Sequence, residues 1–152
     1  MITIYQADKE NNHIRRIETY TPPATTYIGL STAEADEFPN SGEVPADSEP
    51  TLTGYARIEV QNNSNTWNTS SGGKITNKIE LKFPEIKGVP GEKKIVKWVF
   101  EAETIDGTNN VMYYAKLEPE IELFQFLTIR FNPDDIEFTR TNPTTSTTTS
   151  GS

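Results

Sequence analysis

The sequence predicts an all-β protein, an antiparallel β-sandwich or jelly roll of about seven to nine strands. Short runs of alternating apolar and polar side chains recur from residue 26 to residue 138, separated by turns rich in Gly, Pro, Asn and Asp. This pattern is typical of antiparallel sheets with one packed and one wet face. No segment keeps an apolar period of 3.6 for long, so helices are expected to contribute little.

Three parts are expected along the chain: an extended N-terminal arm over residues 1–24, a β-sandwich domain over residues 25–139 and a low-complexity tail over residues 140–152. In the arm, Ile2 and Ile4 alternate only briefly, a short basic segment follows at residues 13–17, and two prolines close it. Consecutive prolines disfavour helix and favour extended chain. The arm is therefore predicted to be extended, with one or two short strands.

The clearest strand signal is residues 75–83, where apolar and polar side chains alternate with Asn77 as the one exception. Because side chains of a strand alternate between two faces, Ile75, Ile79, Leu81 and Phe83 are predicted to share the packed face. Pro84 ends the run.

The other strands are predicted from the same alternation. A strand is predicted at residues 55–60. Its inward side chains are Ala56, Ile58 and Val60, and its outward side chains are Tyr55, Arg57 and Glu59. The carboxylates Glu59, Glu80 and Glu101 are expected on wet faces. Further strands are expected at residues 26–31, where Ile28 and Leu30 share a face, at 93–100, where Val96, Trp98 and Phe100 share a face, and at 111–117, 121–124, 127–131 and 136–138.

Two loops stand out between these strands. Residues 32–53 are acidic and aperiodic, within a stretch from Ile17 to Ala56 that holds no Lys or Arg. We interpret it as a solvated acidic surface, with a cation site or a basic partner as the alternative. Residues 61–73 form a polar loop around Trp67. This ring is predicted to cap the end of the sandwich, with a stacking platform for a glycan as the alternative.

Composition excludes several classes of function. The chain of 152 residues has no cysteine, so it has no disulfide, no thiol nucleophile and no Cys-based zinc site. Its net charge of −8 argues against binding to nucleic acid or to anionic membranes. It lacks the apolar run of about 20 residues that spans a bilayer, and its start lacks a signal-peptide pattern. We expect a protein made in a cytoplasm without secretion.

Catalytic and metal chemistry is not expected. His13 is the one histidine, and it lies in the predicted arm. An extended arm rarely provides the rigid placement that a catalytic group needs. A small hydrolase is therefore ranked last, and no enzyme activity and no cofactor are predicted. Calcium could be bound by Asp134 and Asp135 or by the acidic 34–36 cluster with Glu34 and Asp36. A plain turn and a solvated loop explain these residues better.

The order of the segments resembles small β-rich virion proteins of tailed bacteriophages, described as capsid-decoration, head-fibre or tail-fibre proteins. The resemblance covers residues 27–139. It rests on Tyr-Ile-Gly-Leu-Ser from Tyr27, Gly-Tyr-Ala-Arg-Ile-Glu-Val from Gly54, the Phe83-Pro84 strand end, Ile-Val-Lys-Trp-Val-Phe from Ile95, and Tyr-Tyr-Ala-Lys-Leu-Glu-Pro from Tyr113.

The resemblance implies a structural virion role without catalysis, a symmetric homo-oligomer, with a trimer favoured, and attachment to the major capsid protein or another virion protein. The arm is the expected anchor, by burying apolar side chains and pairing arginines with carboxylates. The arm residues expected to contact the partner are Ile2, Ile4, Tyr5, Ile14, Arg15, Arg16 and Ile17. The alternative is a tail fibre or carbohydrate-binding module that recognises host-surface glycans through Trp67.

Overall fold

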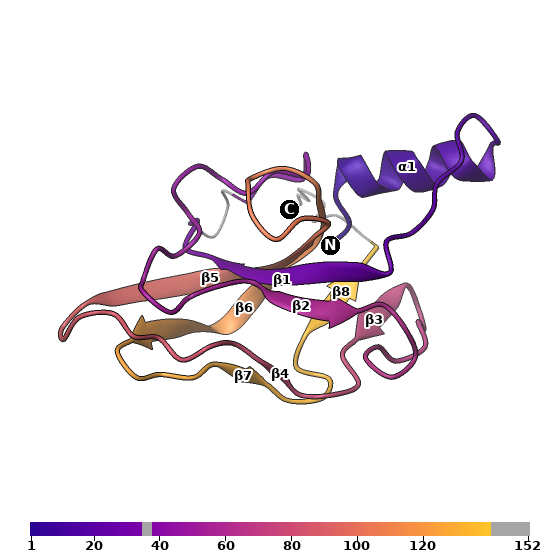
Figure 1. Cartoon of the computed structure of the whole chain (residues 1–152). Coiled ribbons are helices and arrows are strands. Elements are labelled where there is room, and N and C mark those ends of the chain that lie inside the picture. The colour runs from indigo at the N-terminus through magenta and orange to yellow at the C-terminus, as the bar shows by residue number, and fades with distance from the viewer. Residues whose placement is uncertain (35–37, 141–152) are drawn as a thin grey trace, which may run out of the picture.

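The computed structural model describes residues 1–34 and 38–140. Within them the chain forms one helix and eight strands, all paired antiparallel. Figure 1 shows how these elements are arranged. This confirms the predicted all-β class and the strand number. The elements are α1 (Ile4–Ile14), β1 (Thr25–Ser31), β2 (Ile58–Gln61), β3 (Lys74–Thr76), β4 (Leu81–Lys82), β5 (Lys93–Ala102), β6 (Val111–Phe124), β7 (Arg130–Phe131) and β8 (Glu137–Thr139).

The strands form one four-stranded sheet in the order β2-β1-β5-β6 and two two-stranded ribbons, β3–β8 and β4–β7. The ribbons and the sheet enclose the larger core, which contains Leu30, Val96, Phe83, Phe131 and Phe138. The opposite face of the sheet has a second core, formed by other side chains of β5 and β6 with part of the 32–53 loop. The sheet is thus packed on both faces over part of its length.

The second core is rich in aromatic rings. Phe38, from the 32–53 loop, stacks on Tyr114 with ring centroids 5.0 Å apart and also contacts Trp98 and Phe100. Gly29 lies across from Phe100 in the β1–β5 pair, and a Cβ at that position would come within 2.8 Å of the Phe100 ring. A residue without a side chain is therefore required for this ring to pack on β1.

An irregularity in the β5–β6 pairing corrects one prediction. Val96 pairs with Ile121 and Trp98 with Lys116, so one residue of β5 lies opposite four residues of β6 and the regular ladder is interrupted there. Val96 packs in the larger core, whereas Trp98 and Phe100 pack in the second core. The prediction that all three share a face is wrong because the alternation of β5 is broken at this irregularity.

Residues 75–83 are not one strand, as the alternation predicts, but two short strands, β3 and β4, in different ribbons. Asn77 lies at the break and is fully buried. Its Nδ2 donates to the carbonyls of Ile79 and Asn132, both at 2.8 Å, and its Oδ1 accepts from the Ile136 amide at 2.9 Å. Leu81 and Phe83 are buried as predicted, but Ile79 is 46% exposed. The one exception to the alternation marks the place where the chain turns.

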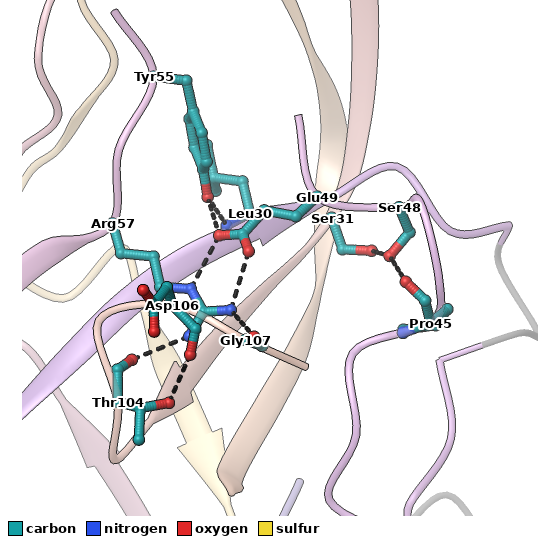
Figure 2. A network of polar contacts seen from close by, with 10 residues as sticks. All are labelled: Leu30, Ser31, Pro45, Ser48, Glu49, Tyr55, Arg57, Thr104, Asp106 and Gly107. Atoms are coloured by element: carbon teal, nitrogen blue, oxygen red, sulfur yellow. Dashed lines mark hydrogen bonds and ion pairs between the residues drawn. The ribbon is translucent and has the colours of Figure 1, made fainter. Parts of the chain in front are cut away.

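Arg57 is buried, although the alternation places it outward, and Ala56 is exposed. The strand β2 begins only at Ile58, so the residues before it do not follow the sheet's alternation. The Arg57 guanidinium forms an ion pair with Glu49 at 2.8 Å and lies over the Phe100 ring at 5.0 Å. Figure 2 shows this network joining the 32–53 loop to the β5–β6 loop.

The N-terminal segment is helical over α1, where the sequence predicts extended chain. Thr3 caps the helix, its Oγ1 accepting from the Gln6 amide at 3.2 Å. The helix contains residues with good helix propensity, such as Gln, Ala, Lys and Glu, but one buried residue, Gln6. Without an apolar stripe it carries no periodic signal. Beyond Arg140, the predicted tail lies outside the described residues, and the three-part division stays a prediction.

Candidate functional site

The first residues of the chain are fastened to β6. Ile2 forms a β-bridge with Tyr113 and is 4% exposed. The Thr3 amide donates to the Met112 carbonyl at 2.9 Å, and the Thr3 hydroxyl donates to the Val111 carbonyl at 2.6 Å. Ile2, predicted to contact a partner, is therefore part of this chain's own core.

One side of α1 is held to the body by polar contacts. Tyr5 Oη donates to Glu103 Oε2 at 2.9 Å, and Lys9 Nζ donates to Glu103 Oε1 at 3.0 Å. The residue after Lys9, Glu10, forms an ion pair with Arg140 at 2.9 Å. Tyr5 is thus half-buried and already has a partner, whereas Ile4 is 47% exposed.

The C-terminal end of α1 is the most exposed part of the arm, and Figure 1 shows it extending past the end of the sheet. Ile14 is 72% exposed and Ile17 is 69% exposed, and Arg15 and Arg16 between them are also exposed. Within the described residues neither guanidinium forms an ion pair with a carboxylate. We call these four residues the α1-end patch.

His13 lies beside this patch and is exposed. Its Nδ1 accepts a hydrogen bond from the Tyr20 amide at 3.1 Å, which ties the α1–β1 connection to the helix. The described residues contain no cluster of three His, Cys, Asp or Glu side chains that could hold a metal ion. Asp135 accepts from the Asn132 amide at 2.8 Å, and Asp134 accepts from Thr76 Oγ1 at 2.9 Å. Asp36 lies outside the described residues.

A pocket of about 440 Å³ lies between α1 with its connection to β1, the 61–73 loop and the start of β6. Trp67 forms part of its wall but is 8% exposed. Its Nε1 donates to Asn62 Oδ1 at 3.0 Å, and its ring lies 6.3 Å from Phe138, centroid to centroid. Most of the Trp67 ring, the alternative platform for a glycan, therefore packs against the core.

Glu101 also lines this pocket and is 6% exposed, although the alternation places it on a wet face. That end of β5 has both faces covered, because α1 and its connection overlie the sheet there. Thr26 Oγ1 lies 2.6 Å from Glu101 Oε2. Desolvation raises the pKa of Glu101 to about 7, and the hydrogen bond with Thr26 opposes this shift.

The raised pKa of Glu101 predicts how stability depends on pH. The folded state holds this proton up to about pH 7, whereas an unfolded Glu releases it near pH 4.3. Between these values the folded state binds more protons, so the contribution of Glu101 to the free energy of unfolding falls as pH rises. Urea unfolding at pH 5 and pH 8 should show that E101Q gains stability relative to the wild type at pH 8. An equal effect of E101Q at both pH values would contradict this assignment.

Comparison with known proteins adds the family. The chain matches the family described as Podophage GP4 fiber I protein gp80 over residues 1–139. It belongs to this family. The match includes α1 and the residues that fasten it to β6, so the helix is part of the family's shared region.

No curated protein matches the chain. The family makes this chain a phage fibre protein with a structural role in the virion, as the resemblance implied. Within its described part, the fibre protein has no helix that is both long and apolar enough to cross a bilayer.

Proposed function

We propose that this fibre protein is a non-catalytic subunit on the particle surface, as a head fibre or decoration protein. Its α1-end patch attaches it to the major capsid protein or another virion protein. The observation that carries the proposal is the fastening of α1: Thr3 bonds to β6 and Lys9 bonds to Glu103. The patch begins at the last residue of this fastened helix and continues into the turn that follows it. A preorganised surface loses little entropy on binding.

The chemistry of the patch suits a protein partner. Two isoleucines flank two arginines, and apolar and arginine side chains are the ones that contribute most at interfaces. The chain as a whole has a net charge of −8, so a local pair of cations directs a partner's carboxylates to this end of the molecule. Of the seven predicted arm residues, Ile2 and Tyr5 are engaged within the chain. The remaining candidates for the anchor are the four residues of the patch and Ile4, at the other end of α1.

The test compares incorporation into particles for a patch variant and a matched control. The patch variant is I14S/R15E/R16E/I17S, and the control is V89S/K93E/K94E/I95S, which also removes two exposed apolar and two exposed basic side chains. We expect the patch variant to fall at least about tenfold in copies per particle, measured by mass spectrometry against the capsid protein. Its thermal unfolding should match the wild type, because the changed side chains are exposed.

Two results would contradict attachment through the patch. In the first, the patch variant is incorporated into particles as well as the wild type. In the second, the copies per particle of the control variant fall as far as those of the patch variant. Light scattering on the same preparations measures the oligomer, for which we propose a homotrimer.

The second candidate function is recognition of host-surface glycans. It is favoured by the pocket beside Trp67, whose lining combines aromatic, amide and carboxylate side chains, the mixture of apolar walls and few polar groups found in small-ligand sites. A glycan array with the full chain tests it: binding to one family of bacterial-surface glycans would support it, and an array without signal would exclude it.

A further inference from the structure

The pocket between α1 and the 61–73 loop brings together side chains from four separate parts of the chain. Tyr20 follows α1, Asn63 and Asn68 come from the loop, Glu101 lies near the end of β5, and Tyr113 lies near the start of β6. Its volume of about 440 Å³ falls in the range of small-molecule sites. We call it the Glu101 pocket.

Three of these polar side chains each keep one atom without a hydrogen bond to the described residues. Glu101 is bonded through Oε2 to Thr26 but not through Oε1. Asn63 Oδ1 accepts from the Asn65 amide, while its Nδ2 is free. Asn68 Nδ2 donates to Thr76 and Asp134, while its Oδ1 is free. The pocket therefore offers a donor, an acceptor and a buried carboxyl oxygen.

A buried carboxyl oxygen without a partner is costly, and a ligand that bonds to it recovers that free energy. The mixture of free donor and acceptor atoms suits hydroxyl groups, which both donate and accept. A cation would satisfy the acceptors but not Asn63 Nδ2. No Lys, Arg or His lines the pocket in the described part of the chain, so an anionic ligand would meet no opposite charge.

The lining also includes apolar groups. Met112 and Ile75 contribute aliphatic groups, and Tyr20 and Tyr113 contribute aromatic rings. Glu10, the other carboxylate of the lining, is already paired with Arg140 at 2.9 Å. A ligand with hydroxyl groups on its edge and C–H groups on its faces matches both kinds of lining.

We propose that the Glu101 pocket binds one pyranose unit of a neutral saccharide, whose hydroxyl groups bond to Glu101, Asn63 and Asn68. The C–H face of the sugar lies against Tyr113. This inference rests on the second candidate function and names its site: Glu101 holds the ligand, and Trp67 supports the wall through Asn62 and is not the platform.

The two tryptophans provide a built-in test in the full chain. Trp67 Nε1 bonds to Asn62 at the pocket wall, whereas Trp98 Nε1 bonds to the Glu34 carbonyl beside the second core. Each gives one indole N–H signal in a nitrogen-15 NMR spectrum. Titration with methyl glycosides of glucose, galactose, mannose, rhamnose and N-acetylglucosamine should shift the Trp67 signal for at least one sugar and leave the Trp98 signal in place.

The variant E101Q keeps the side-chain shape but replaces the carboxyl group, and E122Q removes a surface carboxyl group at the far end of β6. We expect E101Q to weaken binding of that sugar about tenfold and E122Q to leave it unchanged. The urea unfolding of E101Q at pH 5 and pH 8 shows independently whether this variant is folded.

The outcomes distinguish failure of the Glu101 pocket as the binding site from failure of glycan recognition as the function. Glycan binding on the array with an unmoved Trp67 signal, or with E101Q equal to the wild type, would overturn the pocket while leaving glycan recognition in place. Absence of binding on the array and in the titration would overturn both. Attachment through the α1-end patch depends on neither result.

Discussion

Replacing Arg57 by Met is expected to lower the free energy of unfolding by about 4 kcal/mol. The Arg57 side chain is 1% exposed. Its Nε and Nη2 donate to the two oxygens of Glu49 at 2.9 and 2.8 Å, and Nη1 donates to the Thr104 carbonyl at 2.9 Å. Nη2 also contacts the Gly107 carbonyl, as Figure 2 shows. Methionine would leave the carboxylate without its cation and two carbonyls without donors.

The control for this experiment is Arg130→Met. Arg130 pairs with Glu80 at 3.1 Å on the surface, where both side chains are about half exposed. A surface pair of this kind contributes about 0–1 kcal/mol. Urea unfolding of both variants distinguishes the effect of removing a buried ion pair from that of removing a surface ion pair. If R57M lowered the free energy of unfolding no more than R130M does, the structural role of the network would be contradicted. That role is to tie the 32–53 loop to the β5–β6 loop over the second core.

Asn77→Ala is expected to cost about 3 kcal/mol, because it leaves two carbonyls and one amide without their side-chain partner. The affected groups are the carbonyls of Ile79 and Asn132 and the amide of Ile136. Asn77 is fully buried, so water does not readily replace these bonds. Thermal and urea unfolding should both show the loss.

The matched control is Asn109→Ala, an exposed asparagine whose removal should change stability by no more than about 0.5 kcal/mol. Asn77→Asp keeps an acceptor for Ile136 but loses both donors, so it should also destabilise the fold. If Asn77→Ala behaved like the Asn109 control, the side chain would not be what holds β3 and β4 in separate ribbons.

The sequence predicts the strands well where one face is packed and the other is wet. Ile28, Leu30, Leu81 and Phe83 all lie in the larger core because alternation is a direct consequence of strand geometry. The prediction from alternation fails where the period of two is broken. The irregular β5–β6 pairing after Val96 and the break at Asn77 depend on contacts with residues distant in sequence, and alternation carries no information about them.

Buried charge and the helix were missed for a related reason. Arg57 and Glu101 appear polar and therefore outward in the pattern, but the first is enclosed by the β5–β6 loop and the second by the α1–β1 connection. The helix α1 is held by ion pairs and hydrogen bonds to Glu103 and Arg140. Its stability comes from tertiary polar contacts, which a hydropathy pattern does not report.

The candidate sites divide in the same way. The residues of the α1-end patch are proposed as contacts from the sequence, because a basic segment between isoleucines is a local feature, and the structure shows that they are exposed. The Glu101 pocket was not, since its lining comes from residue 6 to residue 113 of the chain. A local signal existed for Trp67 alone, and that residue turned out to be largely buried.

The central claim is that this fibre protein is attached to the particle through the α1-end patch. Cryo-electron microscopy of purified particles tests it most directly. We expect density for this four-stranded sheet with its two ribbons on the outside of the particle, with residues 14–17 buried against a neighbouring virion protein. The same density with those residues facing solvent, or particles without the fold, would contradict it.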